Sequence, residues 1–263
     1  MPRFAANLTT MFTEHPFGDR FRAAARAGFT AVECQFPYEL SVEEAAALLN
    51  EAGLSLVLFN LPPGDWAAGE RGIACIPGRQ SDFRDALALA LRYARALACP
   101  RLHAMSGLVP GAADRAEIRR TFVSNLRLAA AACADAGVEL LIEPINNRDV
   151  PGYFMNNTAL AAGIIEEIGA PNLGLQLDLY HCQISEGDLA MRIRSLLPVT
   201  RHVQIAGVPD RHEPDCGEVN YPYLFRLLDD LGYDGWVGCE YFPRGRTEDG
   251  LGWLHGMNAP AAR

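Results

Sequence analysis

Residues 136–144 of this chain read AGVELLIEP, and they join the end of a helical pattern to a short apolar run. Gly137 follows an alanine-rich stretch, and the apolar residues that begin at Val138 are enough for one strand. Glycine favours the left-handed conformation that ends many helices, so this pattern predicts a helix followed directly by a buried strand. The run closes with Glu143, which places an acidic side chain at the carboxyl end of the predicted strand.

The same helix end recurs at Gly28, Gly53 and Gly232. Ser41 and Glu44 have the spacing of a capping box, which predicts the start of the helix that Gly53 ends. Together with residues 139–145, further apolar runs predict eight strands, which alternate with seven helices and a short tail. The predicted strands are residues 4–8, 31–36, 55–61, 101–105, 139–145, 173–179, 202–206 and 236–241.

Eight strand–helix units in 263 residues favour a single (β/α)₈ TIM barrel that spans residues 1–263. An open doubly wound sheet is the alternative, but the glycine-rich first turn that is typical of such sheets is absent. Residues 61–80 are the longest irregular stretch and follow the third predicted strand. Long loops inside compact domains are usually functional or mobile, so we expect a lid here.

The charged residues exclude several kinds of chemistry. All 23 basic residues are arginine, and the absence of lysine excludes Schiff-base, pyridoxal phosphate and P-loop chemistry, each of which needs a lysine amine. The 32 acidic residues give a net charge of −9 without a basic cluster, so we expect no nucleic-acid partner.

No apolar run is long enough to span a bilayer, and the first residues lack the apolar core of a signal peptide. The seven cysteines are scattered and form no C-x-x-C motif, which is typical of reduced thiols. We therefore expect a cytoplasmic protein that has no membrane partner, and we leave open a homo-oligomer.

Polar residues at the carboxyl ends of barrel strands point toward the active site. Four predicted strands carry such a residue in or just after an apolar run: Glu143, Asp178, Gln204 and Glu240. Buried carboxylates on neighbouring strands repel one another unless a cation lies between them, and an all-oxygen ligand set favours Mg²⁺ or Mn²⁺. The alternative is that each residue is satisfied separately, at a helix N-terminus or in an ion pair with an arginine.

Two further residues are predicted to lie at the mouth of the barrel. His181 follows Asp178 by three positions, and Arg211 lies beyond the seventh strand, so both are candidates for substrate binding. Arg211 is suited to a bidentate contact with a substrate carboxylate. The alternatives are a hydrogen-bonded structural histidine and a surface salt bridge of Arg211 with a neighbouring acid.

Long stretches of the chain resemble the hydroxypyruvate isomerase family, which lies within the xylose isomerase-like barrels. The resemblance covers nearly the whole chain and is carried by residues 4–12 (FAANLTTMF), 77–79 (PGR), 143–146 (EPIN), 211–214 (RHEP), 217–221 (GEVNY), 238–241 (GCEY) and 250–253 (GLGW). It implies a barrel that acts on small hydroxy-carbonyl acids, with Glu143 and Glu240 as the acid/base pair. It also implies Glu143, Asp178, Gln204 and Glu240 as the ligands of a divalent metal.

Two stretches of the chain resemble branches of the family that act on different substrates. Residues 148–152 (RDVPG) resemble the hydroxypyruvate branch, whereas residues 208–215 (VPDRHEPD) resemble the 2-oxo-tetronate isomerase branch. We give the first more weight and expect an intramolecular isomerase that interconverts hydroxypyruvate and tartronate semialdehyde by enediol proton transfer. The alternatives are a 2-oxo-tetronate isomerase, a metal-dependent nuclease that acts at abasic sites, and a non-catalytic barrel that binds sugar acids.

Overall fold

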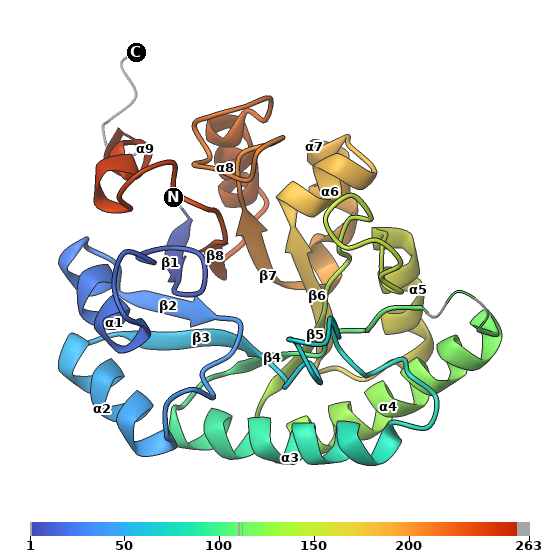
Figure 1. Ribbon diagram of the computed structural model, residues 1–263. Coiled ribbons are helices and arrows are strands. Elements are labelled where there is room, and N and C mark those ends of the chain that lie inside the picture. Colours follow the sequence, from blue (N-terminus) through green and yellow to red (C-terminus); the bar gives the residue numbers. More distant parts are fainter. Residues whose placement is uncertain (1, 110, 112, 257–263) are drawn as a thin grey trace.

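The computed structural model describes residues 2–109, 111 and 113–256, and its eight parallel strands close into one barrel (Figure 1). Each strand pairs with the next along the chain, and β8 pairs with β1. The strands are β1 (Arg3–Asn7), β2 (Ala31–Cys34), β3 (Ser55–Asn60), β4 (Arg101–His103), β5 (Glu139–Ile142), β6 (Leu173–Asp178), β7 (Thr200–Ile205) and β8 (Trp236–Cys239).

Helices follow the strands and lie around the outside of the barrel (Figure 1). They are α1 (Phe17–Arg26), α2 (Val42–Ala52), α3 (Gln80–Ala96), α4 (Arg115–Asp135), α5 (Thr158–Ile168), α6 (Leu179–Ser185), α7 (Leu189–Leu196), α8 (Tyr221–Asp230) and α9 (Gly252–Gly256), with short 3₁₀ turns at Leu197–Val199 and Glu248–Gly250. The predicted TIM barrel is therefore confirmed. Residues 1, 110, 112 and 257–263 of the predicted domain lie outside the described part.

Apolar side chains of the strands and of the inner helix faces form the main core. All six residues of β6 are buried, as expected for a strand with the barrel interior on one side and helices on the other. On α4, residues such as Ile118, Phe122 and Cys133 recur at helical spacing and are fully buried. This packing leaves the carboxyl ends of the strands as the place where polar side chains gather.

The predicted helix ends are also confirmed. The Ser41 hydroxyl accepts a hydrogen bond from the Glu44 amide, and the Glu44 carboxylate accepts one from the Ser41 amide. Gly53 has a φ of 65° and Gly137 a φ of 70°, so both adopt the left-handed conformation that ends a helix. The connection between β6 and β7 differs from the prediction, because it contains two helices, α6 and α7, separated near Gly187.

The irregular stretch after β3 is anchored to the barrel at several points. The Cys75 amide donates to the Ser106 carbonyl at 2.7 Å, and the Asn125 side chain donates to the Ala74 carbonyl at 2.8 Å. The segment also brings Trp66 to the mouth of the barrel. Its role as a moving lid stays a prediction. Within the residues described, no helix has the length and apolarity that crossing a membrane requires.

Candidate active site at the carboxyl ends of the strands

The four polar residues predicted at strand ends lie on four consecutive strands of the barrel. Asp178 is the last residue of β6, Gln204 lies near the end of β7, and these two residues are paired in register. Glu143 directly follows β5 and Glu240 directly follows β8. All four side chains are buried, so their charges and dipoles must be balanced by one another and by their neighbours.

Five of the six predicted site residues line one cavity of about 250 Å³. These are Glu143, His181, Gln204, Arg211 and Glu240. The sixth, Asp178, contacts this group, because its Oδ2 lies 3.7 Å from His181 Nε2 and 3.9 Å from Arg211 Nη2. The structure therefore brings together residues that lie up to 97 positions apart, from 143 to 240, in the sequence.

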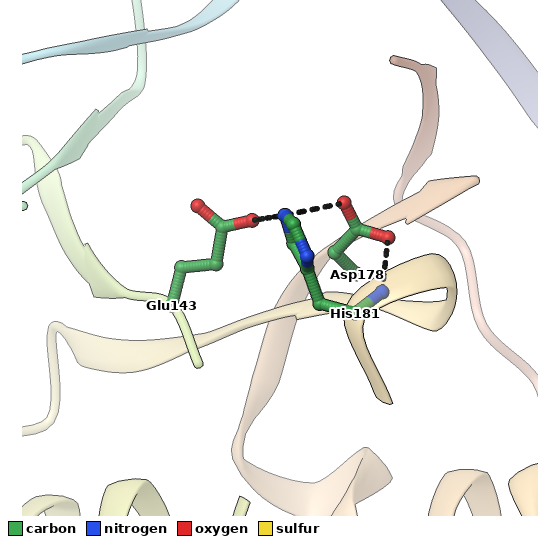
Figure 2. A group of neighbouring side chains, drawn as sticks. All are labelled: Glu143, Asp178 and His181. Carbon is green, nitrogen blue, oxygen red and sulfur yellow. Dashed lines mark hydrogen bonds and ion pairs between the residues drawn. The ribbon is translucent and has the colours of Figure 1, made fainter. Parts of the chain in front are cut away.

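Glu143, Asp178 and His181 form a compact cluster (Figure 2). One potential ligand atom from each lies within 4.8 Å of the others, and His181 Nε2 lies 3.9 Å from Glu143 Oε1. Asp178 Oδ1 caps α6 by accepting hydrogen bonds from the amides of Tyr180 and His181. The other oxygen of Asp178 and Oε1 of Glu143 are buried and accept no hydrogen bond within the described residues.

Hydrogen bonding fixes the orientation of the His181 ring. The Asp149 amide donates to Asn146 Oδ1 at 2.8 Å, so the Asn146 amide nitrogen points the other way and lies 2.6 Å from His181 Nδ1. His181 Nδ1 therefore accepts a hydrogen bond, and Nε2 carries the hydrogen. Burial, together with the charge of Arg211, lowers the pKa of His181 well below its ordinary value, so the ring is neutral at neutral pH. Its Nε2–H faces the cavity as a donor.

Glu240 is held by two side chains. Arg211 Nη2 donates to Glu240 Oε2 at 3.0 Å, and Gln35 Nε2 donates to Oε1 at 3.0 Å. Arg211 also lies near Asp178 and 4.0 Å from Asp149, so three protein carboxylates surround its guanidinium. The role of Arg211 toward a substrate carboxylate stays a prediction.

Gln204 belongs to a second network deeper in the barrel. Its Oε1 accepts from Gln176 Nε2 at 2.6 Å, and its Nε2 donates to Glu33 Oε1 at 2.7 Å. Glu33 also accepts from Asn7 Nδ2 at 2.9 Å and lies 2.6 Å from His202 Nε2. The oxygen of Gln204 is thus bonded to another side chain, and its role as a metal ligand remains a prediction.

The pKa values show how strongly the site disfavours uncompensated negative charge. Burial raises the pKa of Glu143 well above its ordinary value, and the charges of Glu240 and Asp178 raise it further. Burial also raises the pKa of Asp178 to about 7, although Arg211 opposes this shift, and it raises the pKa of Glu240. A cation that faced these carboxylates would offset the same penalty.

These residues fit a divalent cation by charge and by ligand chemistry. Glu143, Asp178 and Glu240 carry three negative charges when ionised and Arg211 carries one positive charge, which leaves two negative charges to balance. The unpaired oxygens of Glu143 and Asp178 are the hard donors that Mg²⁺ and Mn²⁺ prefer. The neutral His181 is a donor through Nε2 in this arrangement, which agrees better with substrate binding than with metal ligation.

Several residues of the site were missed by sequence reasoning. Glu33, on β2, is buried within the network that holds Gln204, and Asn146 orients His181. Arg71 and Trp66 reach the cavity from the irregular loop after β3. An acid inside the apolar run of residues 31–34 was a usable signal for Glu33, whereas loop residues have no periodicity that reveals where they point.

Known proteins share this chain's sequence and fold. The family model described as "Xylose isomerase-like TIM barrel" matches residues 21–257. A 2-oxo-tetronate isomerase from Cupriavidus necator is 58% identical over 97% of this chain and 98% of the relative. The hydroxypyruvate isomerase of Escherichia coli is 46% identical over the same shares of the two chains.

A solved structure titled as an AP endonuclease, family 2, from Brucella melitensis superposes with a TM-score of 0.96. It is 55% identical to this chain, and the match covers 97% of this chain and 99% of that one. The predicted resemblance is thus confirmed over nearly the full length: the chain belongs to the hydroxypyruvate isomerase family of xylose isomerase-like TIM barrels.

Proposed function

We propose that the protein is a metal-assisted isomerase of small hydroxy-carbonyl acids that interconverts hydroxypyruvate and 2-hydroxy-3-oxopropanoate (tartronate semialdehyde). The observation that carries the proposal is the pair of buried glutamates, Glu143 and Glu240, that line one cavity from strands separated by β6 and β7. Buried carboxylates with raised pKa values are suited to taking up and returning a proton near neutral pH.

The reaction moves one proton between neighbouring carbons. One glutamate removes a proton from C3 of hydroxypyruvate, which leaves an enediolate across C3 and C2. The other glutamate delivers a proton to C2, and the hydroxyl proton on O3 is exchanged for one on O2, so that an aldehyde forms at C3. General acid–base catalysis of this kind contributes roughly 10²- to 10⁴-fold.

The remaining groups of the site bind and orient. The Nε2–H of His181 is placed to donate to a substrate oxygen, and Arg211 holds Glu240 in position through its 3.0 Å contact. Glu143, Asp178, Gln204 and Glu240 are the residues that we propose to hold Mg²⁺ or Mn²⁺. A bound divalent cation supplies Lewis-acid stabilisation of the negative charge that develops on the substrate oxygens.

Two measurements test the proposal. Purified protein with Mg²⁺ or Mn²⁺ is assayed with hydroxypyruvate, with and without a chelator, and the reaction is repeated in heavy water. We expect chelator-sensitive isomerisation and solvent deuterium on the product carbon. Absence of turnover with either metal, or conversion without deuterium incorporation in every condition, would contradict the proposed route.

A second candidate substrate is a 2-oxo-tetronate, which has one more carbon. It is favoured by the 58% identical relative from Cupriavidus necator, whose name is 2-oxo-tetronate isomerase. The same glutamates and the same proton transfer would serve both substrates. Comparing kcat/KM for hydroxypyruvate and for a 2-oxo-tetronate decides between them.

A nuclease reading fits the cavity less well. Four acidic residues line it, namely Glu33, Glu143, Asp149 and Glu240, against two arginines. A phosphate backbone needs an excess of positive charge, so the balance favours a small acid that a few groups can hold. Glu143→Gln and Glu240→Gln variants that bind substrate without turnover would also exclude a barrel that only binds sugar acids.

The remaining expectations belong to this proposal. A cytoplasmic location agrees with the seven cysteines, all of which are free thiols. A small-molecule substrate agrees with the size of the cavity. A homo-oligomer is a prediction that light scattering of the purified protein would test.

A further inference from the structure

A second arginine reaches the cavity from the irregular loop after β3. Arg71 lines the same cavity as Glu143 and Glu240, whereas Arg211 enters it from the loop after β7. Carboxylates surround the guanidinium of Arg211, whereas the charge of Arg71 is not balanced in this way. Among the described residues, no carboxylate forms an ion pair with Arg71, which instead contacts two backbone carbonyls and one aromatic ring.

These contacts hold the guanidinium but leave one of its edges open. Nη1 of Arg71 donates to the Glu70 carbonyl at 2.8 Å and to the Trp66 carbonyl at 3.2 Å. The Trp66 ring covers one face of the guanidinium, with 3.8 Å between the guanidinium carbon and the ring centroid. Nε and Nη2 take part in no hydrogen bond among the residues that the structure describes. These two nitrogens form the edge that binds a carboxylate side-on through two parallel hydrogen bonds.

The acid nearest to Arg71 in sequence is occupied elsewhere. Glu70 Oε1 lies 2.5 Å from Arg79 Nη1, and Glu70 Oε2 accepts from the Asp65 amide at 2.5 Å. Both oxygens of Glu70 are therefore used to hold the loop together. Glu70 therefore does not neutralise the charge of Arg71.

The backbone next to Arg71 is fixed against the barrel. Gly72 has a φ of 101°, and a Cβ at this position would overlap the backbone of Met105. The Gly72 amide donates to the Pro63 carbonyl at 2.9 Å, and Gly72 forms a β-bridge with Ser106. Only glycine allows so close an approach, and it sets where the Arg71 side chain begins.

We propose that Arg71 binds the carboxylate of the substrate and thereby makes the enzyme selective for acids over neutral hydroxy-ketones. The inference rests on the proposed function, since it assumes that the substrate is a hydroxy-carbonyl acid. Arg211 is surrounded by three protein carboxylates, so Arg71 is the arginine of the cavity whose charge is available to an anion. A substrate carboxylate held by Arg71 fixes which end of the molecule is presented to the glutamates.

The test compares Arg71→Gln and Arg71→Lys with the wild-type protein. The control is Arg22→Gln, which removes the same charge from an exposed position on α1, where Arg22 lies 4.0 Å from Glu51. Pyruvate and hydroxyacetone are the probes for calorimetric titration, because they differ only in carboxylate against hydroxymethyl and neither requires turnover. Thermal melts check that each variant is folded.

We expect Arg71→Gln to weaken pyruvate binding about 10- to 100-fold, the usual effect of losing hydrogen bonds to a charged group, and to leave hydroxyacetone binding unchanged. Arg71→Lys keeps the charge but loses the paired N–H donors of the guanidinium, so its affinity for pyruvate should lie between that of the wild type and that of Arg71→Gln. With hydroxypyruvate as substrate, KM should rise more than kcat falls. Arg22→Gln should match the wild type throughout.

The outcomes separate this inference from the proposed function. Pyruvate that binds Arg71→Gln as tightly as the wild type, or wild-type protein that binds pyruvate no better than hydroxyacetone, overturns the role of Arg71. Wild-type protein that turns over no hydroxy-carbonyl acid overturns the proposed function. In that case, a loss of pyruvate binding in Arg71→Gln would still support a carboxylate site at Arg71.

Discussion

The side-chain nitrogen of Asn146 lies 2.6 Å from Nδ1 of His181, and this contact determines which ring nitrogen of the histidine carries the hydrogen. Because Asn146 donates to Nδ1, the hydrogen is on Nε2, the atom that faces Glu143 and Asp178. The ring is buried and neutral, so it offers the cavity one hydrogen-bond donor and no charge.

Asn146→Ala is therefore expected to lower kcat by roughly 10-fold, the lower end of the range known for partners that orient metal-binding histidines. Without the side-chain amide, only the backbone amide of residue 146 still donates to Nδ1, at 3.5 Å, so the ring and the position of its hydrogen are held less firmly. Steady-state kinetics with hydroxypyruvate measure the effect. Asn50→Ala, at an exposed position of α2, is the control, and a kcat equal to that of the wild type in Asn146→Ala would contradict the role.

The raised pKa of Asp178 predicts how the metal-free protein responds to pH. The folded protein keeps a proton on Asp178 up to about pH 7, whereas the unfolded chain loses it near the ordinary value of 3.8. Proton binding by the folded state therefore stabilises it at low pH, and this contribution is lost as the pH rises from 3.8 to about 7. Glu143 and Glu240 shift in the same direction.

Urea unfolding in chelator, at about pH 5 and about pH 7.5, tests this relationship through the free energy of unfolding. We expect stability to fall more steeply over this range in the wild type than in Asp178→Asn, which cannot ionise. Asp215→Asn, which changes an exposed acid, should behave like the wild type. Equal slopes in wild type and Asp178→Asn would show that Asp178 ionises normally.

The barrel and the strand-end residues were predictable from sequence because each rests on a repeated local rule. Glycine at a helix end and an apolar run after it mark β2, β3, β5 and β8, and parallel strands bring their carboxyl ends to one side of the sheet. Glu143 and Asp178 thus meet although no local signal links them. The split between α6 and α7, and the short β4, depend on packing that one segment does not reveal.

The contacts of the site were not predictable in the same way. Which of the three carboxylates around Arg211 accepts a hydrogen bond from it depends on side-chain distances that no spacing rule determines, and so does the bond between Gln204 and Gln176. Arg71 lies in a loop without periodicity, and its place at the cavity follows from the tight packing of Gly72 against Met105. Loops carry function but not the patterns that identify strands and helices.

The predicted ligand set and the orientation of His181 predict different Mn²⁺ affinities for His181→Asn and for Gln204→Ala. Because His181 Nε2 carries a hydrogen, His181→Asn should leave Mn²⁺ affinity within about 2-fold and lower turnover. Gln204→Ala removes a predicted oxygen ligand and should weaken Mn²⁺ binding. Glu143→Gln should weaken it most, since a charged ligand is lost from a buried site.

Thermal shift in increasing Mn²⁺ measures these affinities. A ligand at 100 times its Kd stabilises the wild type by about 2.7 kcal/mol, and fitting the logarithmic rise of stability with Mn²⁺ concentration gives the Kd. Asp215→Asn again serves as the control for general charge loss. A larger loss of Mn²⁺ affinity in His181→Asn than in Gln204→Ala would place His181 in the ligand set instead.

Replacing glycine by alanine should change the free energy of unfolding in opposite directions at Gly238, beside the buried Glu33, and at the exposed Gly163. A Cβ at Gly238 on β8 would overlap the Glu33 carboxylate, which already bonds to Asn7 and Gln204 and lies in contact with His202. Gly238→Ala should therefore destabilise the protein by about 1–3 kcal/mol, the usual cost of overpacking. Gly163 lies inside α5 and is exposed, and nothing would lie within 4 Å of an added Cβ.

Gly163→Ala should accordingly stabilise the protein by about 0.5–1 kcal/mol, because alanine loses less backbone freedom in a helix. Chemical denaturation of both variants beside the wild type compares the two free energies of unfolding. Since the amide of Gln204 is held by Glu33, Gly238→Ala should also lower Mn²⁺ affinity, whereas Gly163→Ala should not. A Gly238→Ala protein as stable as the wild type would mean that the Glu33 carboxylate has room to move, and the network would then not fix Gln204.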